Sequence, residues 1–336
     1  MLFPDESRSG GAVSSNGVKS RGQSAGGKCG AAGRILALAF VFTAAPRLAD
    51  AQNLLTPAPS AFRADASLVL VPVTVVDRRG AIVNGLSSEA FTLTEDGARQ
   101  HIRSFSEEDA PVSMGIVLDL SASMKRVLGD AKTSLQSLLQ DANPADEAFL
   151  NGVSTHPRPY SGFTQDFGDL LGRVAFEEAG GNTALVDTIY DSLQELHKGI
   201  HARKALLVIS DGMDNHSRHS QGELLELAME SDAQIYTIGV GDPAKQYAKP
   251  MERMAENRGL VFLDELSAKT GGLSFAVHRQ ADVTNATANI GRALRNQYTI
   301  GYVPAGNNRT GQWRRIKVTV AGSGMKAYAR AGYRNN

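Results

Sequence analysis

The sequence predicts an α/β fold with a doubly wound, mostly parallel sheet, together with a second, β-sandwich-like module built from the N-terminal and C-terminal flanks. Between Val112 and Arg295, short apolar runs typical of buried strands alternate with stretches whose apolar residues recur at helical spacing. The segments on either side are instead rich in β-branched residues and turn signals. A length of 336 residues is enough for about two domains, each with its own core.

The first part of the chain has the features of an export signal. Residues 1–33 are rich in Gly, Ser and Ala and show no apolar periodicity, so we expect them to be disordered. Arg34 is followed by the apolar run 35–45 and then by the small-residue triplet 49–51, the order typical of a secretory signal peptide. This run is too short to span a bilayer, which takes about 20 residues. We therefore predict a leader and signal peptide over 1–51, a secreted, periplasmic or cell-envelope location, and no stable membrane span after cleavage.

A linker over 52–66, containing Pro57 and Pro59, is predicted to lead into an N-terminal β module over 67–110. Its first strand is expected at 67–77, where β-branched and apolar residues dominate. A second strand over 91–95 ends at an Asp-Gly turn signal, and we expect it to pair with a strand over 101–105. These strands are too few to close a sandwich. The strands expected in the segment 297–336 are therefore predicted to complete the module.

The segment 111–296 is predicted to form the doubly wound domain, because its strand and helix signals alternate in the manner of parallel βαβ units. Strands are expected at 114–118, 148–153, 205–210, 235–240 and 273–277, and helices at 127–139, 184–196, 224–229, 262–269 and 283–295. The run 205–210 is apolar until its last residue, as expected for a strand covered on both faces.

Oxygen-bearing side chains follow two of these strands and suggest a site for a divalent cation. Asp119, Ser121 and Ser123 come directly after the strand 114–118, and Asp211 follows the strand 205–210. Thr183 lies in a Gly-Gly-Asn-Thr turn just before the helix 184–196. In parallel sheets, ligands bind beyond the carboxyl ends of the strands, so these loops are expected to converge. Carboxylate and hydroxyl oxygens suit Mg²⁺ or a similar hard cation.

These residues resemble the metal-ion-dependent adhesion site of the von Willebrand factor type A domain, whose pattern is D-x-S-x-S, a distant Thr and a distant Asp. All five positions are filled, by Asp119, Ser121, Ser123, Thr183 and Asp211. The resemblance covers 112–295 and implies a doubly wound sheet, a bound cation and a protein ligand rather than a reaction. The flanks are similar to those of an exported, acidobacterial-type group with a von Willebrand A-related domain. That likeness lies in the run 91–100 and in the tail from Tyr298 to Tyr333, and it implies no particular activity.

The second strand of the domain departs from the usual pattern of this family. Asn151 and Gly152 stand where an unbroken apolar run is common. This departure concerns the packing of the strand 148–153 and leaves the five site residues unaffected.

Composition and missing motifs exclude several other classes of protein. The chain has 35 basic and 35 acidic residues and a pI near 7.1, so it lacks the basic surface of a dedicated nucleic-acid binder. Cys29 is the single cysteine, which excludes an intrachain disulfide and multi-cysteine metal sites. The histidine pairs His216/His219 and His197/His201 have no further ligand at zinc-site spacing and are interpreted as surface residues. Neither a nucleophile elbow nor a phosphate-binding glycine loop is present, so no enzymatic activity is expected.

The leading hypothesis is an exported protein-binding module of the adhesion type. In it, Mg²⁺, or alternatively Mn²⁺ or Ca²⁺, is completed by an Asp or Glu carboxylate of a partner protein. One alternative is a structural envelope or assembly component with a vestigial metal site. Another is a Mg²⁺-dependent phosphatase based on Asp119, although such enzymes usually carry a second Asp two positions later, where Ser121 stands here.

Overall fold

The structure is a computed structural model that describes residues 68–242, 249–305 and 311–335. The predicted leader and signal peptide over 1–51 and the linker over 52–66 lie outside the described residues. Among the helices of the described part, none combines the length and apolar character needed to cross a membrane.

The larger domain is built on a six-stranded sheet with the order β10-β9-β8-β5-β6-β7. Its strands are β5 (Val112–Asp119), β6 (Glu147–Val153), β7 (Arg158–Thr164), β8 (Arg203–Ser210), β9 (Ala233–Val240) and β10 (Ser274–Val277). All neighbours pair in parallel except β6 and β7. From β5 the chain continues to β6 on one side and later to β8, β9 and β10 on the other. This reversal of strand order at β5 confirms the doubly wound prediction.

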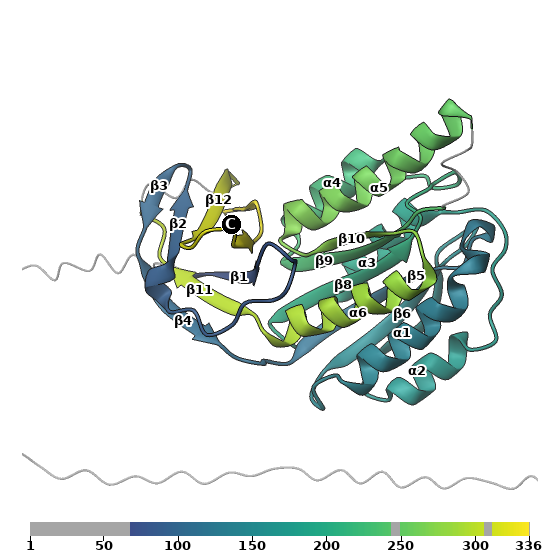
Figure 1. Ribbon diagram of the computed structural model, residues 1–336, viewed down its shortest axis with the longest axis horizontal. Helices are drawn as coiled ribbons and strands as arrows, with labels where there is room; N and C mark the ends of the chain where they lie inside the picture. The colour runs from purple at the N-terminus through teal and green to yellow at the C-terminus, as the bar shows by residue number, and fades with distance from the viewer. Residues whose placement is uncertain (1–67, 243–248, 306–310, 336) are drawn as a thin grey trace, which may run out of the picture. The chain divides into compact units, whose positions relative to one another are not determined.

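Helices cover both faces of this sheet. One layer contains α1 (Leu128–Gln140), α2 (Phe167–Val174) and α6 (Gln280–Arg295), and the other contains α3 (Leu185–Leu196), α4 (Gln221–Glu230) and α5 (Pro250–Thr270) (Figure 1). In β5, Ile116 and Leu118 belong to the core beneath the first layer, whereas Val117 belongs to the core beneath the second. Because both faces are buried, the central strands are continuous apolar runs rather than alternating ones.

The unusual Asn151-Gly152 pair in β6 is accommodated by specific packing. Every residue of β6 is buried, and the Asn151 side-chain amide donates a 2.8 Å hydrogen bond to Ser192 Oγ on α3. A Cβ at Gly152 would lie 2.6 Å from the ring of Tyr160 on β7, so only glycine leaves room for this ring. The departure from an apolar strand is therefore explained by two neighbouring side chains.

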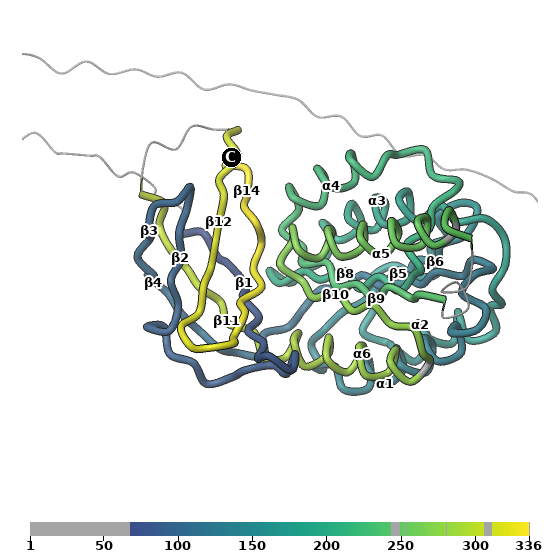
Figure 2. The backbone as a smooth tube through the Cα atoms, turned by 45° about the horizontal axis from the view of Figure 1, so that its top comes forward, coloured from purple at the N-terminus to yellow at the C-terminus, as the bar shows by residue number. Residues whose placement is uncertain are grey.

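The flanks of the chain form two four-stranded antiparallel sheets, with the orders β13-β1-β11-β4 and β14-β12-β2-β3. Their strands are β1 (Val69–Val76), β2 (Phe91–Glu95), β3 (Ala98–Gln100), β4 (Ile102–Glu107), β11 (Tyr298–Tyr302), β12 (Trp313–Val320), β13 (Lys326–Tyr328) and β14 (Gly332–Arg334), and a 3₁₀ turn at Ser88–Ala90 precedes β2. Each sheet combines early and late strands, as Figure 2 shows in blue and yellow. The predicted β-sandwich-like second module is thus confirmed.

One predicted strand pairing is wrong. The strand expected at 101–105 does not pair with β2; β3 does, and β4 pairs with β11 in the other sheet. The reason lies in the turn, where Asp96 and Gly97 have φ angles of 49° and 86°. These angles form a tight two-residue hairpin that places Ala98 directly opposite Glu95. The chain then changes sheets after Gln100.

Candidate metal centre

The candidate site lies where the order of the central sheet reverses. β5 and β8 are parallel neighbours, with Leu118 opposite Ile209, so both strands end at the same edge. Ser210, the last residue of β8, donates a 2.5 Å hydrogen bond from its hydroxyl to Asp119 Oδ2. The same hydroxyl accepts a 3.0 Å bond from the backbone N–H of Gly212. Ser210 therefore connects the carboxylate at the end of β5 to the loop that begins with Asp211.

The first loop carries three of the five predicted ligands. Asp119 is fully buried, and its Oδ1 accepts a 2.9 Å bond from the backbone N–H of Ser121. The hydroxyls of Ser121 and Ser123 lie 3.0 Å apart. Ser121 is buried and Ser123 is exposed, so this row of oxygens runs from the interior to the surface. A 3₁₀ helix over Ala122–Arg126 follows and leads into α1.

Thr183 is buried in the loop before α3 and is tied to both other loops. Its backbone N–H donates to Asn215 Oδ1 at 3.0 Å, and its backbone carbonyl accepts from the N–H groups of Asn215 and His216 at 3.0 and 3.1 Å. On the other side, the N–H of Gly180 donates to the carbonyl of Leu120 at 2.7 Å. The structure thus places the Thr183 loop beside the loop after β5 and the loop after β8.

Asp211 has a buried carboxylate oxygen that lacks a hydrogen-bond partner. Oδ1 accepts a 3.0 Å bond from the backbone N–H of Met213, but Oδ2 has no partner among the described residues. Leaving a buried charged oxygen unpaired is costly, so such groups normally face a donor or a cation. This oxygen, together with the carboxylate and hydroxyls of the neighbouring loops, is a donor set that fits a hard divalent cation.

The raised pKa of Asp119, which lies near Asp211, also fits a site for a cation. Burial, helped by the neighbouring charge of Asp211, raises the pKa of Asp119 to about 6, although the hydrogen bonds from Ser121 and Ser210 act to lower it. Two carboxylates that share a buried site disfavour each other's ionised form. A divalent cation bound at this site would favour the ionised form of Asp119.

The structure therefore brings Asp119, Ser121 and Ser123 together on one loop, with Asp211 and Thr183 on adjoining loops. Sequence reasoning missed Ser210 and Asn215, which connect these loops. The turn-forming run from Asp211 to Asn215 was the available signal, but it does not tell which backbone groups its side chains meet. Among the residues that the structure describes, no cluster of three or more His, Cys, Asp and Glu could hold a metal. The candidate site is not such a cluster, because three of its five donors are the hydroxyls of Ser121, Ser123 and Thr183.

The two histidines after Asp211 have separate environments. His219 Nδ1 lies 2.7 Å from Asp187 Oδ1, and its ring stacks on Tyr190 with centroids 4.0 Å apart. His216 is exposed, and its ring lies 5.6 Å from that of His156.

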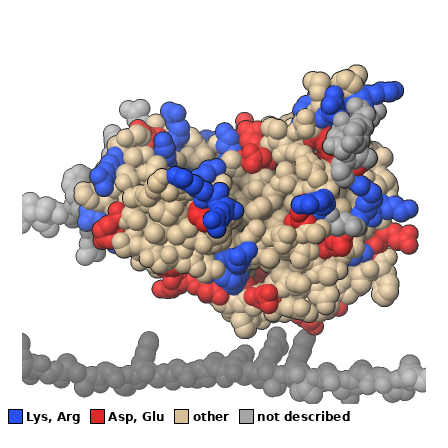
Figure 3. All heavy atoms as spheres, viewed as in Figure 1, with Lys and Arg blue, Asp and Glu red and all other residues tan. Residues whose placement is uncertain are grey.

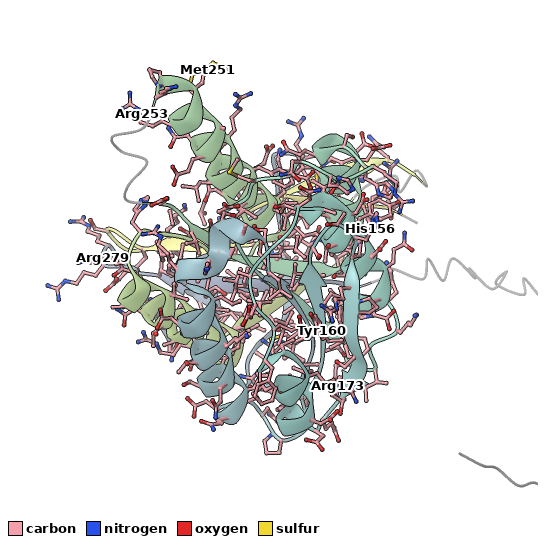
Figure 4. All side chains as sticks on the ribbon, turned by 90° about the vertical axis from the view of Figure 1, so that its right-hand side faces the viewer. His156, Tyr160, Arg173, Met251, Arg253 and Arg279 are labelled. Atoms are coloured by element: carbon pink, nitrogen blue, oxygen red, sulfur yellow. The ribbon has the colours of Figure 1, made fainter. Side chains whose placement is uncertain are left out.

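Side chains from several elements surround the end of the domain that carries the carboxyl ends of the strands. Figure 4 looks onto this end, with Met251 and Arg253 at the tip of α5 and Arg279 before α6 on one side, and His156 and Tyr160 on the other. Arg126, which follows the candidate ligands of the first loop, forms a 2.6 Å ion pair with Asp242, two residues after the end of β9. On the face seen in Figure 3, basic and acidic side chains are interspersed rather than gathered by sign.

Comparison with known proteins gives distant similarities only. No protein-family model matches the chain. An uncharacterised protein of Borreliella burgdorferi is 26% identical over 184 residues, which are 48% of this chain and 53% of that protein, so the chain spans about half the length of this curated relative.

The chain also has weak similarity to several solved structures. BatB from Bacteroides thetaiotaomicron has a TM-score of 0.42 and 16% identity, covering 54% of this chain and 98% of that one. The von Willebrand domain of the type V pili tip protein Mfa5 from Porphyromonas gingivalis has a TM-score of 0.44 and 15% identity, covering 55% and 95%. A von Willebrand factor type A protein from Catenulispora acidiphila has a TM-score of 0.45 and 12% identity, covering 80% and 74%.

Proposed function

We propose that this protein, whose central domain has the von Willebrand factor type A fold, is an exported, metal-ion-dependent protein-binding module of the adhesion type. In this proposal Asp119, Ser121, Ser123, Thr183 and Asp211 hold Mg²⁺, or alternatively Mn²⁺ or Ca²⁺, directly or through water. The observation that carries the proposal is the buried Oδ2 of Asp211, which has no hydrogen-bond partner in the described part of the chain. It lies on the loop that Ser210 joins to the buried carboxylate of Asp119.

A partner carboxylate is the natural last ligand for such a cation. Hard divalent cations take six or more oxygen ligands, and the five side chains leave at least one position open. Three of those five ligands are uncharged hydroxyls, so the bound cation retains attraction for an anion. Because Ser123 is exposed at the surface end of the first loop, an incoming Asp or Glu can approach from solvent.

Two features favour a binding role over a catalytic one. The position two residues after Asp119, where a Mg²⁺-dependent phosphatase usually has its second Asp, is occupied by Ser121. The hydroxyl of Ser121 lies beside that of Ser123, and among the described residues no His or Lys is hydrogen-bonded to it as a base. The proposed export rests on the basic, apolar and small-residue pattern of residues 34–51.

Partner capture tests the complete proposal. The full chain and its Asp211→Ala variant are cross-linked to cell-envelope extract, each with Mg²⁺ and with EDTA, and the captured proteins are identified. We expect a partner captured by the unaltered chain in Mg²⁺ only. Capture that neither EDTA nor Asp211→Ala reduces would instead support a structural role with a vestigial site.

A further inference from the structure

We propose that Asn215 is a positioning residue for the candidate metal centre, because it joins the loop that carries Thr183 to the loop that carries Asp211. This inference rests on the proposed function. Asn215 itself is not among the predicted ligands, and its role is to hold two ligand-bearing loops at a fixed separation.

The contact between Asn215 and Thr183 is reciprocal. Asn215 Oδ1 accepts the Thr183 N–H at 3.0 Å, while the Asn215 N–H donates to the Thr183 carbonyl at 3.0 Å. Both backbone polar groups of Thr183 are therefore bound to the same residue. Asn215 follows Asp211 by four positions, so the pair fixes the spacing between two candidate ligands from different loops.

The neighbours of Asn215 anchor its loop to the first turn of α3. Asp214 Oδ2 accepts the N–H of Val186 at 2.8 Å, and Ser217 Oγ accepts the N–H of Asp187 at 3.0 Å. Ser217 also donates its hydroxyl to Asp214 Oδ2 at 2.5 Å. Since Thr183 lies two residues before the first residue of this helix, the loop after β8 holds both the start of α3 and the segment that leads into it. These backbone donors at a helix start would otherwise lack partners.

The base of the same loop is fixed by close backbone packing. Gly212 has a φ of 75°, and a Cβ there would lie 2.4 Å from the backbone carbon and oxygen of Gly259 on α5. Asp211 is thus held against α5 at one end of the loop, and Asn215 holds Thr183 at the other. Because the loop is fixed at its base, the contact of Asn215 with Thr183 sets the position of Thr183 relative to Asp211.

Asn215 is suited to this role, and its replacement should affect metal binding more than folding. Asn215 is exposed, so removal of its side-chain amide leaves no buried cavity. A residue at this position needs a side-chain oxygen of this length to accept the Thr183 N–H, which Asp also provides and Ala does not. Substitution of groups that orient metal ligands typically lowers metal affinity about 10- to 100-fold.

The test measures binding of Mg²⁺ and Mn²⁺ alone by titration calorimetry, together with the melting temperature in EDTA, on the full chain. Asn215→Ala is expected to weaken metal binding at least about tenfold, and Asn215→Asp to remain within about threefold of the unaltered chain. Ser220→Ala is the matched control in the same loop, because Ser220 caps α4 by accepting the Glu223 N–H. It is expected to lower the melting temperature and to leave metal affinity unchanged.

Each outcome supports or overturns the inference. If Asn215→Ala weakens metal binding by less than about tenfold, whatever its melting temperature, Asn215 is merely structural and the inference is wrong. If Asn215→Ala does not fold, Asn215→Ser is measured against the same expectation. If the unaltered chain binds neither ion, or binds no better than Asp211→Ala, the proposed function itself fails and the inference falls with it.

Discussion

Replacing Asp211 by Asn should stabilise the metal-free protein and abolish its response to metal. Asn has nearly the same shape and keeps the oxygen that accepts the Met213 N–H. It removes the charge from a buried group whose second oxygen has no hydrogen-bond partner within the described ranges, and whose charge opposes ionisation of Asp119. An unsatisfied buried polar group costs about 1–3 kcal/mol. Because the new amide also needs a partner, we expect only part of this, a net gain of about 1 kcal/mol in the free energy of unfolding.

Metal binding would stabilise the unaltered protein and not the variant, so in Mg²⁺ it works against the advantage of the variant. If the dissociation constant is roughly 10⁻⁴ M, 1 mM Mg²⁺ stabilises the unaltered protein by about 1.4 kcal/mol. A change of 1 kcal/mol moves the melting temperature of a domain of this size by about 2–4 °C. In EDTA, Asp211→Asn should therefore melt about 2–4 °C above the unaltered chain. In Mg²⁺ the unaltered chain should gain about 3–6 °C and the variant nothing.

The variant is thus expected to melt higher in EDTA and the unaltered chain to melt higher in Mg²⁺. Differential scanning calorimetry of both proteins at pH 7.5, in EDTA and in 1 mM Mg²⁺, checks this reversal. Asp141→Asn, an exposed acidic residue at the end of α1, is the control for a simple change in net charge. A variant that melts below the unaltered chain in EDTA would refute the electrostatic reasoning. A variant with an undiminished Mg²⁺ shift would refute the assignment of Asp211 to the metal.

Three further predictions concern other parts of the structure. Gly212→Ala should lower stability by more than about 2 kcal/mol in thermal unfolding, because its φ is 75° and the new Cβ meets the backbone of Gly259. Burial would raise the pKa of Asp187, but hydrogen bonds from His219 and Arg218 in the loop after β8 lower it to about 2. Its contribution of about 2 kcal/mol is therefore present above pH 4 and lost as the pH falls to 2, and urea unfolding of Asp187→Asn should show a shallower loss over this range. Tyr302→Phe should cost about 1.5–3 kcal/mol in urea unfolding, because it removes a 2.5 Å bond to the buried Glu95.

Matched variants distinguish these effects from general disturbance. Gly222→Ala in α4 meets no atom closer than 3.9 Å and should be neutral or stabilising. Tyr333→Phe removes a longer, 3.4 Å contact to Glu95, so it should cost clearly less than Tyr302→Phe. Equal losses for the two tyrosines would contradict the importance given to the short bond.

Much of the central domain was predictable because its core elements carry their signals locally. The apolar run before Asp119 and the helical stripe of 184–196 need no knowledge of neighbours, and both correspond to observed elements. β7 is different, since its sequence from Arg158 to Thr164 contains a proline, a glycine and no buried residue. It is an antiparallel edge strand, and its pairing with β6 depends on tertiary context.

The length of α5 and the connections of the candidate site escaped sequence reasoning for a similar reason. α5 begins at Pro250, twelve residues before the predicted start, and Met251 and Met254 on its first turns are 82% and 59% exposed. An exposed segment has no apolar stripe to reveal it. The five candidate ligands could be named from their residue types and order. The role of Asn215 depends on which backbone groups lie opposite it, and spacing along the chain does not give this.

The interleaved construction of the sandwich affects how the protein responds to mechanical load. The inserted domain leaves the sandwich after β4 and returns to it at β11, and these two strands are hydrogen-bonded neighbours, with Glu107 opposite Tyr298. Tension applied at Leu68 and Asn335 therefore acts first on the antiparallel strands of the sandwich. The ladder between β4 and β11 closes the insert into a loop shielded from that tension, so the geometry of its candidate metal centre is preserved until the ladder separates.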